Sequence, residues 1–113
     1  MAHWAELDEN NIVLRVVVTD NEEADEGYQW LIDNHGGTWV KTSYNGNIRY
    51  NFASVGGSYD EQADAFVPVR EYESWVLNTQ TYTWEPPVQK PEGASHWEEE
   101  TQSWFIPVEY DAE

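Results

Sequence analysis

The chain has 113 residues, 40% of them hydrophobic and 15% aromatic, so it is long enough for one domain with a modest core and is not compositionally disordered. Its 22 Asp and Glu against 5 Lys and Arg give a net charge of -17, which repels phosphate backbones and anionic membranes and excludes nucleic acid and membrane as expected partners. Because the chain has no cysteine, disulfides, thiolate nucleophiles and Cys-ligated zinc are excluded as well.

Residues 3–18 are predicted to form a β-hairpin. The run IVLRVVV at 12–18 is β-branched and interrupted only by Arg15, which is typical of a strand buried on most of one face. Upstream, HWAEL at 3–7 alternates, and the Asn10-Asn11 pair marks the turn between the two arms.

One helix is predicted near residues 22–35. Four apolar residues recur there at helical spacing, namely Ala24, Tyr28, Leu31 and Ile32. The acidic residues of 22–26 fall in the predicted first turn, where carboxylates favour the helix dipole. His35-Gly36-Gly37 is expected to supply a left-handed C-cap, and Gly27 to weaken the helix.

A second hairpin is predicted over residues 38–53. The segment TWVKTSYNGNIRYNF alternates on both sides of Asn45-Gly46, the dipeptide best suited to a two-residue type I′ turn. Gly56-Gly57 then permits a sharp change of direction.

A pattern repeats from Tyr59 onward: YDEQADAFVP at 59–68, NTQTYTWEPP at 78–87 and EEETQSWFIP at 98–107. In each copy an acidic or Asn residue opens a turn, an aromatic residue follows six positions later, and a proline follows the aromatic within three residues. The turn residue and its aromatic are Asp60 and Phe66, Asn78 and Trp84, and Glu98 and Trp104. Aromatics also precede the turns, which predicts facing pairs Tyr59–Phe66, Trp75–Trp84 and Trp97–Trp104. Hairpins this small must stack on one another, on the N-terminal sheet or on another protein.

Together these elements predict an α+β fold, mainly antiparallel β, made of successive short β-hairpins with one helix near residues 22–35. We expect a single domain over 1–113, with an N-terminal β-α-β part at 1–57 and a C-terminal run of aromatic hairpin repeats at 58–110. The polar N-terminus has no export signal and no run approaches the ~18 apolar residues of a membrane span, so we expect a soluble protein.

Residues typical of catalysis or metal binding are scattered. Neighbouring carboxylates could serve a glycosidase or calcium, but with 22 acids such neighbours arise by chance, and no DxDxDG spacing is present. His3, His35 and His96 lack zinc spacing, and a cap role is expected for His35. Neither a GxSxG elbow nor a glycine-rich phosphate loop occurs. We expect no enzyme, metal or cofactor.

The seven tryptophans leave two hypotheses open. Exposed rings on a hairpin platform could stack on sugars, or the rings could replace aliphatic core in a chain with little else to bury. In either case the candidate interaction residues lie in the repeats, and they are Trp75, Trp84, Trp97, Trp104, Tyr59 and Phe66.

Three long stretches resemble a family of small proteins encoded by marine tailed phages, especially cyanophages. They are MAHWAELDENNIVLRVVVTDNEE, GGTWVKTSYN, and YNFASVGGSYDEQADAFVPVREYESWVLN with the later YTWEPPV and WEEETQSW. The family's usual opening is similar to MAHFAELDENN, and its YDEERDAF-like box precedes a PYPSWVL-like box. Here Glu71 and Glu73 stand in the usual proline positions of that box, which makes this connection more flexible and more acidic.

The resemblance covers nearly the whole chain and implies a phage context with no transferred catalytic residues. It favours a non-enzymatic virion protein that docks on the particle surface, with capsid decoration ahead of a tail or tail-fibre module contacting host-surface glycans. A soluble host-takeover protein is a third class. The expected partners are other virion proteins of capsid or tail, with a host-surface glycan as the alternative, in a homo-oligomer or a larger multimeric assembly.

Overall fold

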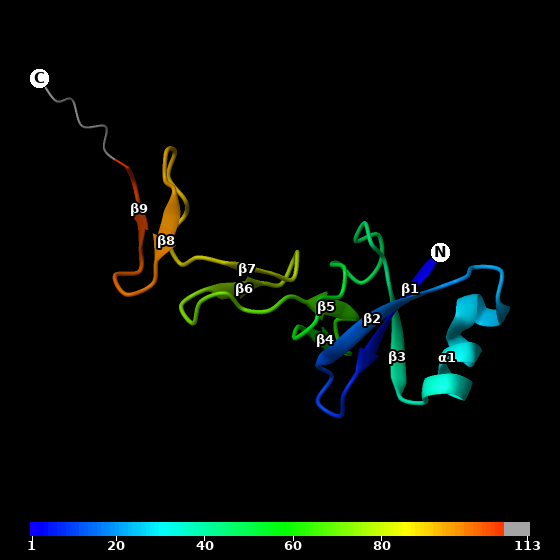
Figure 1. Cartoon of the computed structure of the whole chain (residues 1–113). Coiled ribbons are helices and arrows are strands. Elements are labelled where there is room, and N and C mark those ends of the chain that lie inside the picture. The colour runs from blue at the N-terminus through cyan, green and yellow to red at the C-terminus, as the bar shows by residue number, and fades with distance from the viewer. Residues whose placement is uncertain (108–113) are drawn as a thin grey trace, which may run out of the picture.

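The computed structural model describes residues 1–107. The chain measures 69 × 28 × 22 Å with a radius of gyration of 18.9 Å, whereas a compact domain of this size would have roughly 13 Å. The strands are β1 (Ala2–Leu7), β2 (Val13–Thr19), β3 (Thr38–Thr42), β4 (Ser58–Asp60), β5 (Ala65–Val67), β6 (Val76–Asn78), β7 (Thr83–Glu85), β8 (His96–Glu98) and β9 (Ser103–Phe105), with a 3-10 turn η1 (Ala24–Gly27) and a helix α1 (Tyr28–His35). One three-stranded and three two-stranded antiparallel sheets follow one another along the molecule, confirming the predicted fold class (Figure 1).

The N-terminal sheet has the order β2-β1-β3, and its β1–β2 hairpin confirms the prediction for residues 3–18. The turn is built from local side-chain bonds, because Asp8 Oδ1 accepts hydrogen bonds from the amides of Asn10 and Ile12. Asn11 has a positive φ of 62°, a conformation that asparagine tolerates better than most residues.

The central strand β1 is covered on both faces. On one face, α1 packs Leu31 against a buried cluster made by Ala2, Trp4 and Trp39. On the other face, a second buried cluster is formed by Ala5, Leu7, Val13, Ala53 and Phe66. Since Phe66 comes from β5, this cluster joins the first of the small hairpins to the N-terminal sheet.

The helix is shorter than predicted. It begins at Tyr28 because Gly27 takes a φ of 96° and separates α1 from the 3-10 turn before it. The acidic residues of 22–26 therefore precede the helix, and the prediction that they occupy its first turn is wrong. Gly36 ends the helix at a φ of 63° and donates its N–H to Ile32 O. Within residues 1–107, no helix has the length and apolar character needed to cross a membrane.

The hairpin predicted over residues 38–53 is wrong. The Gly46 amide donates to Ser43 O at 2.9 Å, so the turn here is centred on Tyr44 and Asn45. It is not the predicted type I′ turn, because Gly46 has a positive φ and Asn45 does not. Strand β3 pairs with β1, and the returning segment is not a strand. It is held by side chains instead, since Thr42 Oγ1 accepts the amide of Ala53 at 2.9 Å.

The three C-terminal hairpins share one geometry, and residues 58–107 are called the hairpin array below; residues 108–110 of the predicted run lie outside the described residues. In each, strands of three residues are joined by four residues, the last of which has a positive φ. These residues are Asp64 (53°), Tyr82 (56°) and Gln102 (50°). The predicted repeat is thus present in the backbone as well as in the sequence.

Candidate functional site

Two of the three predicted aromatic pairs form across the hairpins. Tyr59 lies opposite Phe66 with ring centroids 5.2 Å apart, and Trp97 lies opposite Trp104 at 5.3 Å. Phe66 and Trp97 are buried, and the other two rings are half-buried. Phe66 and Trp97 therefore pack the hairpins internally, while Tyr59 and Trp104 stay partly accessible.

The third predicted pair is wrong, because Leu77 and not Trp75 lies opposite Trp84. In this register the position facing Trp75 is occupied by Pro86, which has no N–H for a ladder. Trp75 turns to the next hairpin, where its ring centroid lies 6.2 Å from that of Trp97 and 6.5 Å from that of Trp104. Its Nε1 is buried without a hydrogen-bond partner within the described residues. Trp75 thus links two hairpins.

Trp84 and Trp104 are anchored in the same way. Each indole Nε1 donates to a backbone carbonyl 16 residues earlier, Pro68 O and Val88 O, both at 2.7 Å. Arg70 lies 5.1 Å from the Trp84 ring centroid and Lys90 5.6 Å from that of Trp104. Sequence reasoning missed these cations. The signal was available, since each stands 14 residues before its tryptophan.

A carboxylate joins the β8–β9 hairpin to the segment before β6. Glu99 accepts hydrogen bonds from the Ser74 amide (3.1 Å), the Ser74 hydroxyl (2.5 Å) and the Trp97 indole (2.8 Å), an arrangement called the Glu99 latch below. The Ser74 hydroxyl, and after it the Trp97 indole, lowers the pKa of the Glu99 carboxyl. The latch therefore requires the ionised form.

The β6–β7 hairpin is joined to its predecessor by an amide. Asn51 Nδ2 donates to Phe66 O and to Tyr82 O, each at 2.9 Å, and the rings of Tyr50 and Tyr82 lie 4.7 Å apart. Each hairpin therefore contacts the unit before it through its turn, as in a repeat array.

The first array hairpin carries a tyrosine–carboxylate contact. The Tyr59 hydroxyl donates to Asp64 Oδ1 at 2.5 Å, and Arg49 Nε lies 2.9 Å from the same oxygen. Burial, and after it the bond to Asp64, raises the pKa of Tyr59, while that bond lowers the pKa of Asp64. Both groups stay in the forms that keep this contact at neutral pH.

Exposed apolar side chains recur along the hairpin array. They are Val69, Val76, Val88, Phe105 and Ile106, each about half exposed or more. Exposed apolar side chains are the kind of surface that a partner protein can cover.

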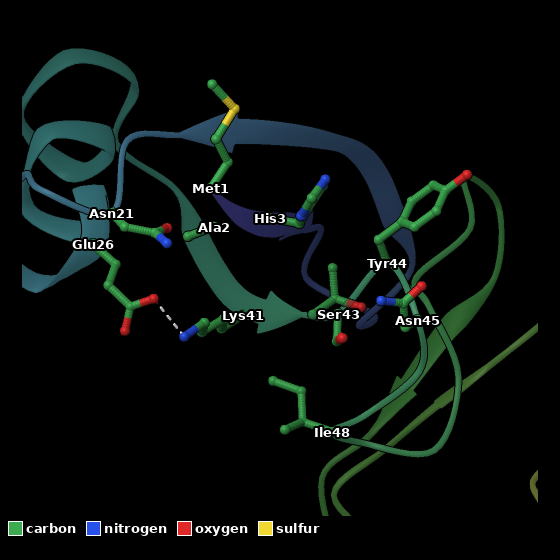
Figure 2. Close-up of a pocket in the computed structure, with 11 residues that line it drawn as sticks. Met1, Ala2, His3, Asn21, Glu26, Lys41, Ser43, Tyr44, Asn45 and Ile48 are labelled. Carbon is green, nitrogen blue, oxygen red and sulfur yellow. Dashed lines mark hydrogen bonds and ion pairs between the residues drawn. The ribbon is translucent and has the colours of Figure 1, made fainter.

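A pocket of about 360 Å³ lies in the N-terminal part of the molecule, beside β1 and β3 (Figure 2). Its lining combines rings and polar groups, with His3 from β1, Lys41 from β3, Asn21 and Glu26 from the segment after β2, and Tyr44 and Asn45 from the loop after β3. No sequence motif marks this site, because its residues come from four separate segments.

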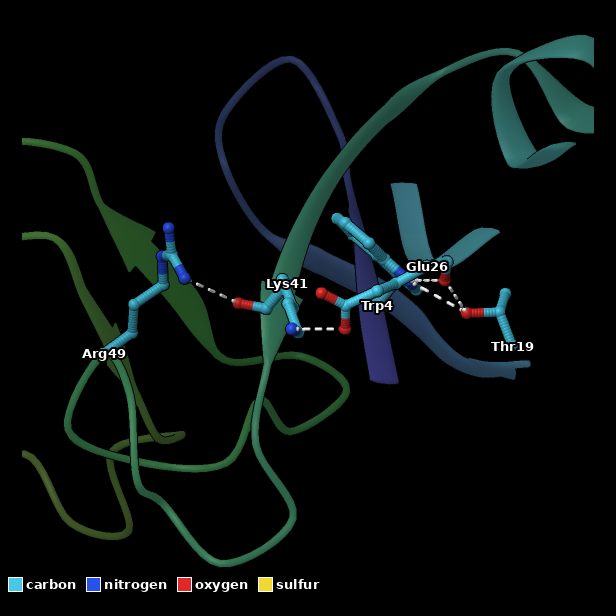
Figure 3. A network of polar contacts seen from close by, with 5 residues as sticks. All are labelled: Trp4, Thr19, Glu26, Lys41 and Arg49. Carbon is cyan, nitrogen blue, oxygen red and sulfur yellow. Dashed lines mark hydrogen bonds and ion pairs between the residues drawn. The ribbon is translucent and has the colours of Figure 1, made fainter. Parts of the chain in front are cut away.

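One side of the pocket is fixed by a polar network (Figure 3). The carbonyl of Glu26 accepts the Trp4 indole at 3.1 Å and the Thr19 hydroxyl at 2.5 Å, while its carboxylate lies 2.5 Å from Lys41 Nζ. Arg49 Nη1 donates to Lys41 O at 3.2 Å. Glu26 thereby ties the 3-10 turn to all three strands of the sheet.

The titratable residues are distributed rather than clustered. His3, His35 and His96 lie in β1, at the end of α1 and in β8, and the described residues contain no group of three His, Asp or Glu arranged to hold a metal ion. All five Lys and Arg are engaged within the chain, three in ion pairs and Arg70 and Lys90 over tryptophans.

Comparisons of this chain with protein-family models, curated proteins and solved structures find no match.

Proposed function

We propose that this chain is a non-enzymatic accessory protein of a tailed-phage particle, docking on the particle surface as a capsid-decorating subunit. The phage context comes from the resemblance of its long sequence boxes. The observation that carries the docking role is the recurrence of exposed apolar side chains in the hairpin array of an elongated molecule. Exposed apolar side chains of this kind suit contact with a shell or with a neighbouring subunit.

The packing of the array tryptophans supports docking over sugar stacking. A sugar that stacks on an indole needs a free ring face. Trp84 and Trp104 each have a cation over the ring, and Trp97 is buried. The tail-fibre alternative, in which these rings contact host glycans, therefore receives less support than capsid decoration.

Location on the particle is tested by mass spectrometry of purified virions followed by immunogold labelling. We expect the protein in the particles and uniform label over the head. Label confined to the tail or fibre tips would overturn decoration in favour of the alternative. Absence from purified particles would leave only the host-takeover class.

The docking surface is tested by adding purified protein to particles that lack it. Val76→Asp and Ile106→Asp place a charge at exposed apolar positions of the array and should reduce capsid binding, because a buried unpaired charge is costly at an interface. Val55→Asp is the matched control, since Val55 is equally exposed but lies outside the hairpin array. Equal loss in all three variants would contradict the assignment.

A further inference from the structure

We propose that the pocket beside β1 and β3 binds a neutral saccharide unit. Its volume of about 360 Å³ lies within the roughly 300–1,000 Å³ typical of small-molecule sites. This site is separate from the docking surface of the hairpin array and goes beyond the proposed function.

The side-chain charges in the pocket cancel. Lys41 Nζ and Glu26 Oε2 lie 2.5 Å apart, and both side chains remain partly exposed. An anionic ligand would have to break this pair and would also face the net charge of -17 carried by the chain. A neutral ligand incurs neither cost.

The polar lining matches hydroxyl groups. Asn21 and Asn45 each offer an amide that donates and accepts, and Ser43 adds a hydroxyl that does both. Sugar hydroxyls also donate and accept, so each can be satisfied by such groups. An apolar ligand would instead leave these groups without partners.

The pocket also has an aromatic wall. Tyr44 is 73% exposed, and its ring contacts those of Phe52, at a centroid distance of 5.6 Å, and His3, at 6.1 Å. Unlike Trp84 and Trp104, Tyr44 is not covered by one of the cations found over rings in this chain. It can therefore present apolar ring surface to the C–H face of a sugar.

The arrangement of the molecule leaves the pocket accessible to a ligand when the array is docked. The pocket is built on the N-terminal sheet, and the array extends away from that sheet along the long axis (Figure 1). A subunit attached through its hairpin array would carry the saccharide site on its N-terminal sheet, away from the attached surface.

The proposal is tested by titrating the ¹⁵N-labelled full chain with glucose, galactose and N-acetylglucosamine while recording amide shifts. Concentrations up to about 50 mM exceed the ~1 mM dissociation constant of a weak site. We expect saturable shifts with at least one sugar, centred on residues 41–48. Glucuronate is the charged comparison and should bind more weakly than glucose.

Tyr44→Ala should weaken the binding by about tenfold through loss of the ring contact, and Asn45→Ala should weaken it as well. Tyr50→Ala is the matched control, because Tyr50 is 48% exposed and lies outside the pocket. The amide spectra themselves report whether each variant is folded. The proposal is overturned if none of the neutral sugars gives saturable shifts, if Tyr44→Ala binds like the unsubstituted chain, or if glucuronate binds best.

Discussion

Phe66 and Trp97 are both buried aromatics of the hairpin array, yet their removal should have different consequences. Phe66 is 1% exposed and belongs to the cluster that includes Ala5 and Leu7 of β1. Phe66→Ala should cost about 3–5 kcal/mol for the cavity, and the lost ring contact with Tyr59 adds about 1 kcal/mol. Because total stability is about 5–15 kcal/mol, most of it should be lost.

Trp97 is 6% exposed, but its ring neighbours are Trp75 and Trp104 of the array. Its removal should cost a similar few kcal/mol locally. In a linear array each unit contacts only its neighbours, so a terminal unit can unfold without the rest. Trp97→Ala should therefore release the last hairpin and leave the N-terminal sheet folded.

Amide hydrogen exchange resolved by residue separates the two outcomes. In Phe66→Ala, the β1 amides should exchange much faster than in the unsubstituted chain. In Trp97→Ala, protection should be lost only in β8 and β9, with β1 unchanged. If Trp97→Ala accelerates exchange in β1 as strongly as Phe66→Ala does, the array and the sheet form one cooperative unit and the reasoning fails.

Three further substitutions probe single contacts. Gly27→Ala should lower the free energy of unfolding by about 1–3 kcal/mol, because Gly27 has a φ of 96° and an added Cβ would lie 2.5 Å from the Cβ of Thr19. The loss should appear as a lower denaturation midpoint, and an unchanged midpoint would refute the close approach. Because the folded-state pKa of Glu99 lies below its ordinary 4.5, the Glu99 latch stabilises the chain above that pH and is lost as the pH falls through the folded-state pKa. Glu99→Gln should remove this pH dependence from amide protection in β8 and β9, and a persisting acid transition there would contradict the latch. Trp104→Phe deletes the bond to Val88 O and should cost about 1 kcal/mol, seen as faster exchange in β9, whereas unaltered exchange would show that the bond contributes nothing.

Local signals made part of the fold predictable. The β1–β2 turn depends on Asp8 and Asn11, which act on backbone groups within four residues. The array turns likewise begin with side chains that bond nearby amides, as when Asp60 Oδ1 accepts from the amide of Gln62 and Asn78 Oδ1 from that of Gln80. Sequence patterns are informative where the deciding contacts are this close in the chain.

The wrong prediction of a hairpin over residues 38–53 depends on distant contacts. The segment after Gly46 has a strand-like pattern, but Arg49 bonds Asp64 and Lys41 O, and Phe66 N donates to Arg49 O. These bonds hold Arg49 at a φ of 53°, which is incompatible with a strand. No local pattern could reveal partners that lie eight to seventeen residues away. The same is true of the saccharide pocket, whose lining comes from several segments.

The positions of the five cations determine which charges a docking partner would have to supply. Two of the five cations, Arg70 and Lys90, lie over the tryptophans of successive hairpins, and Arg15, Lys41 and Arg49 pair with carboxylates. The chain thus uses its whole positive charge to hold itself together, and the remaining carboxylates must be solvated or neutralised from outside. In the docking proposed above, electrostatic complementarity has to come from basic groups on the partner, and the exposed valines and Ile106 are the residues available for apolar contact.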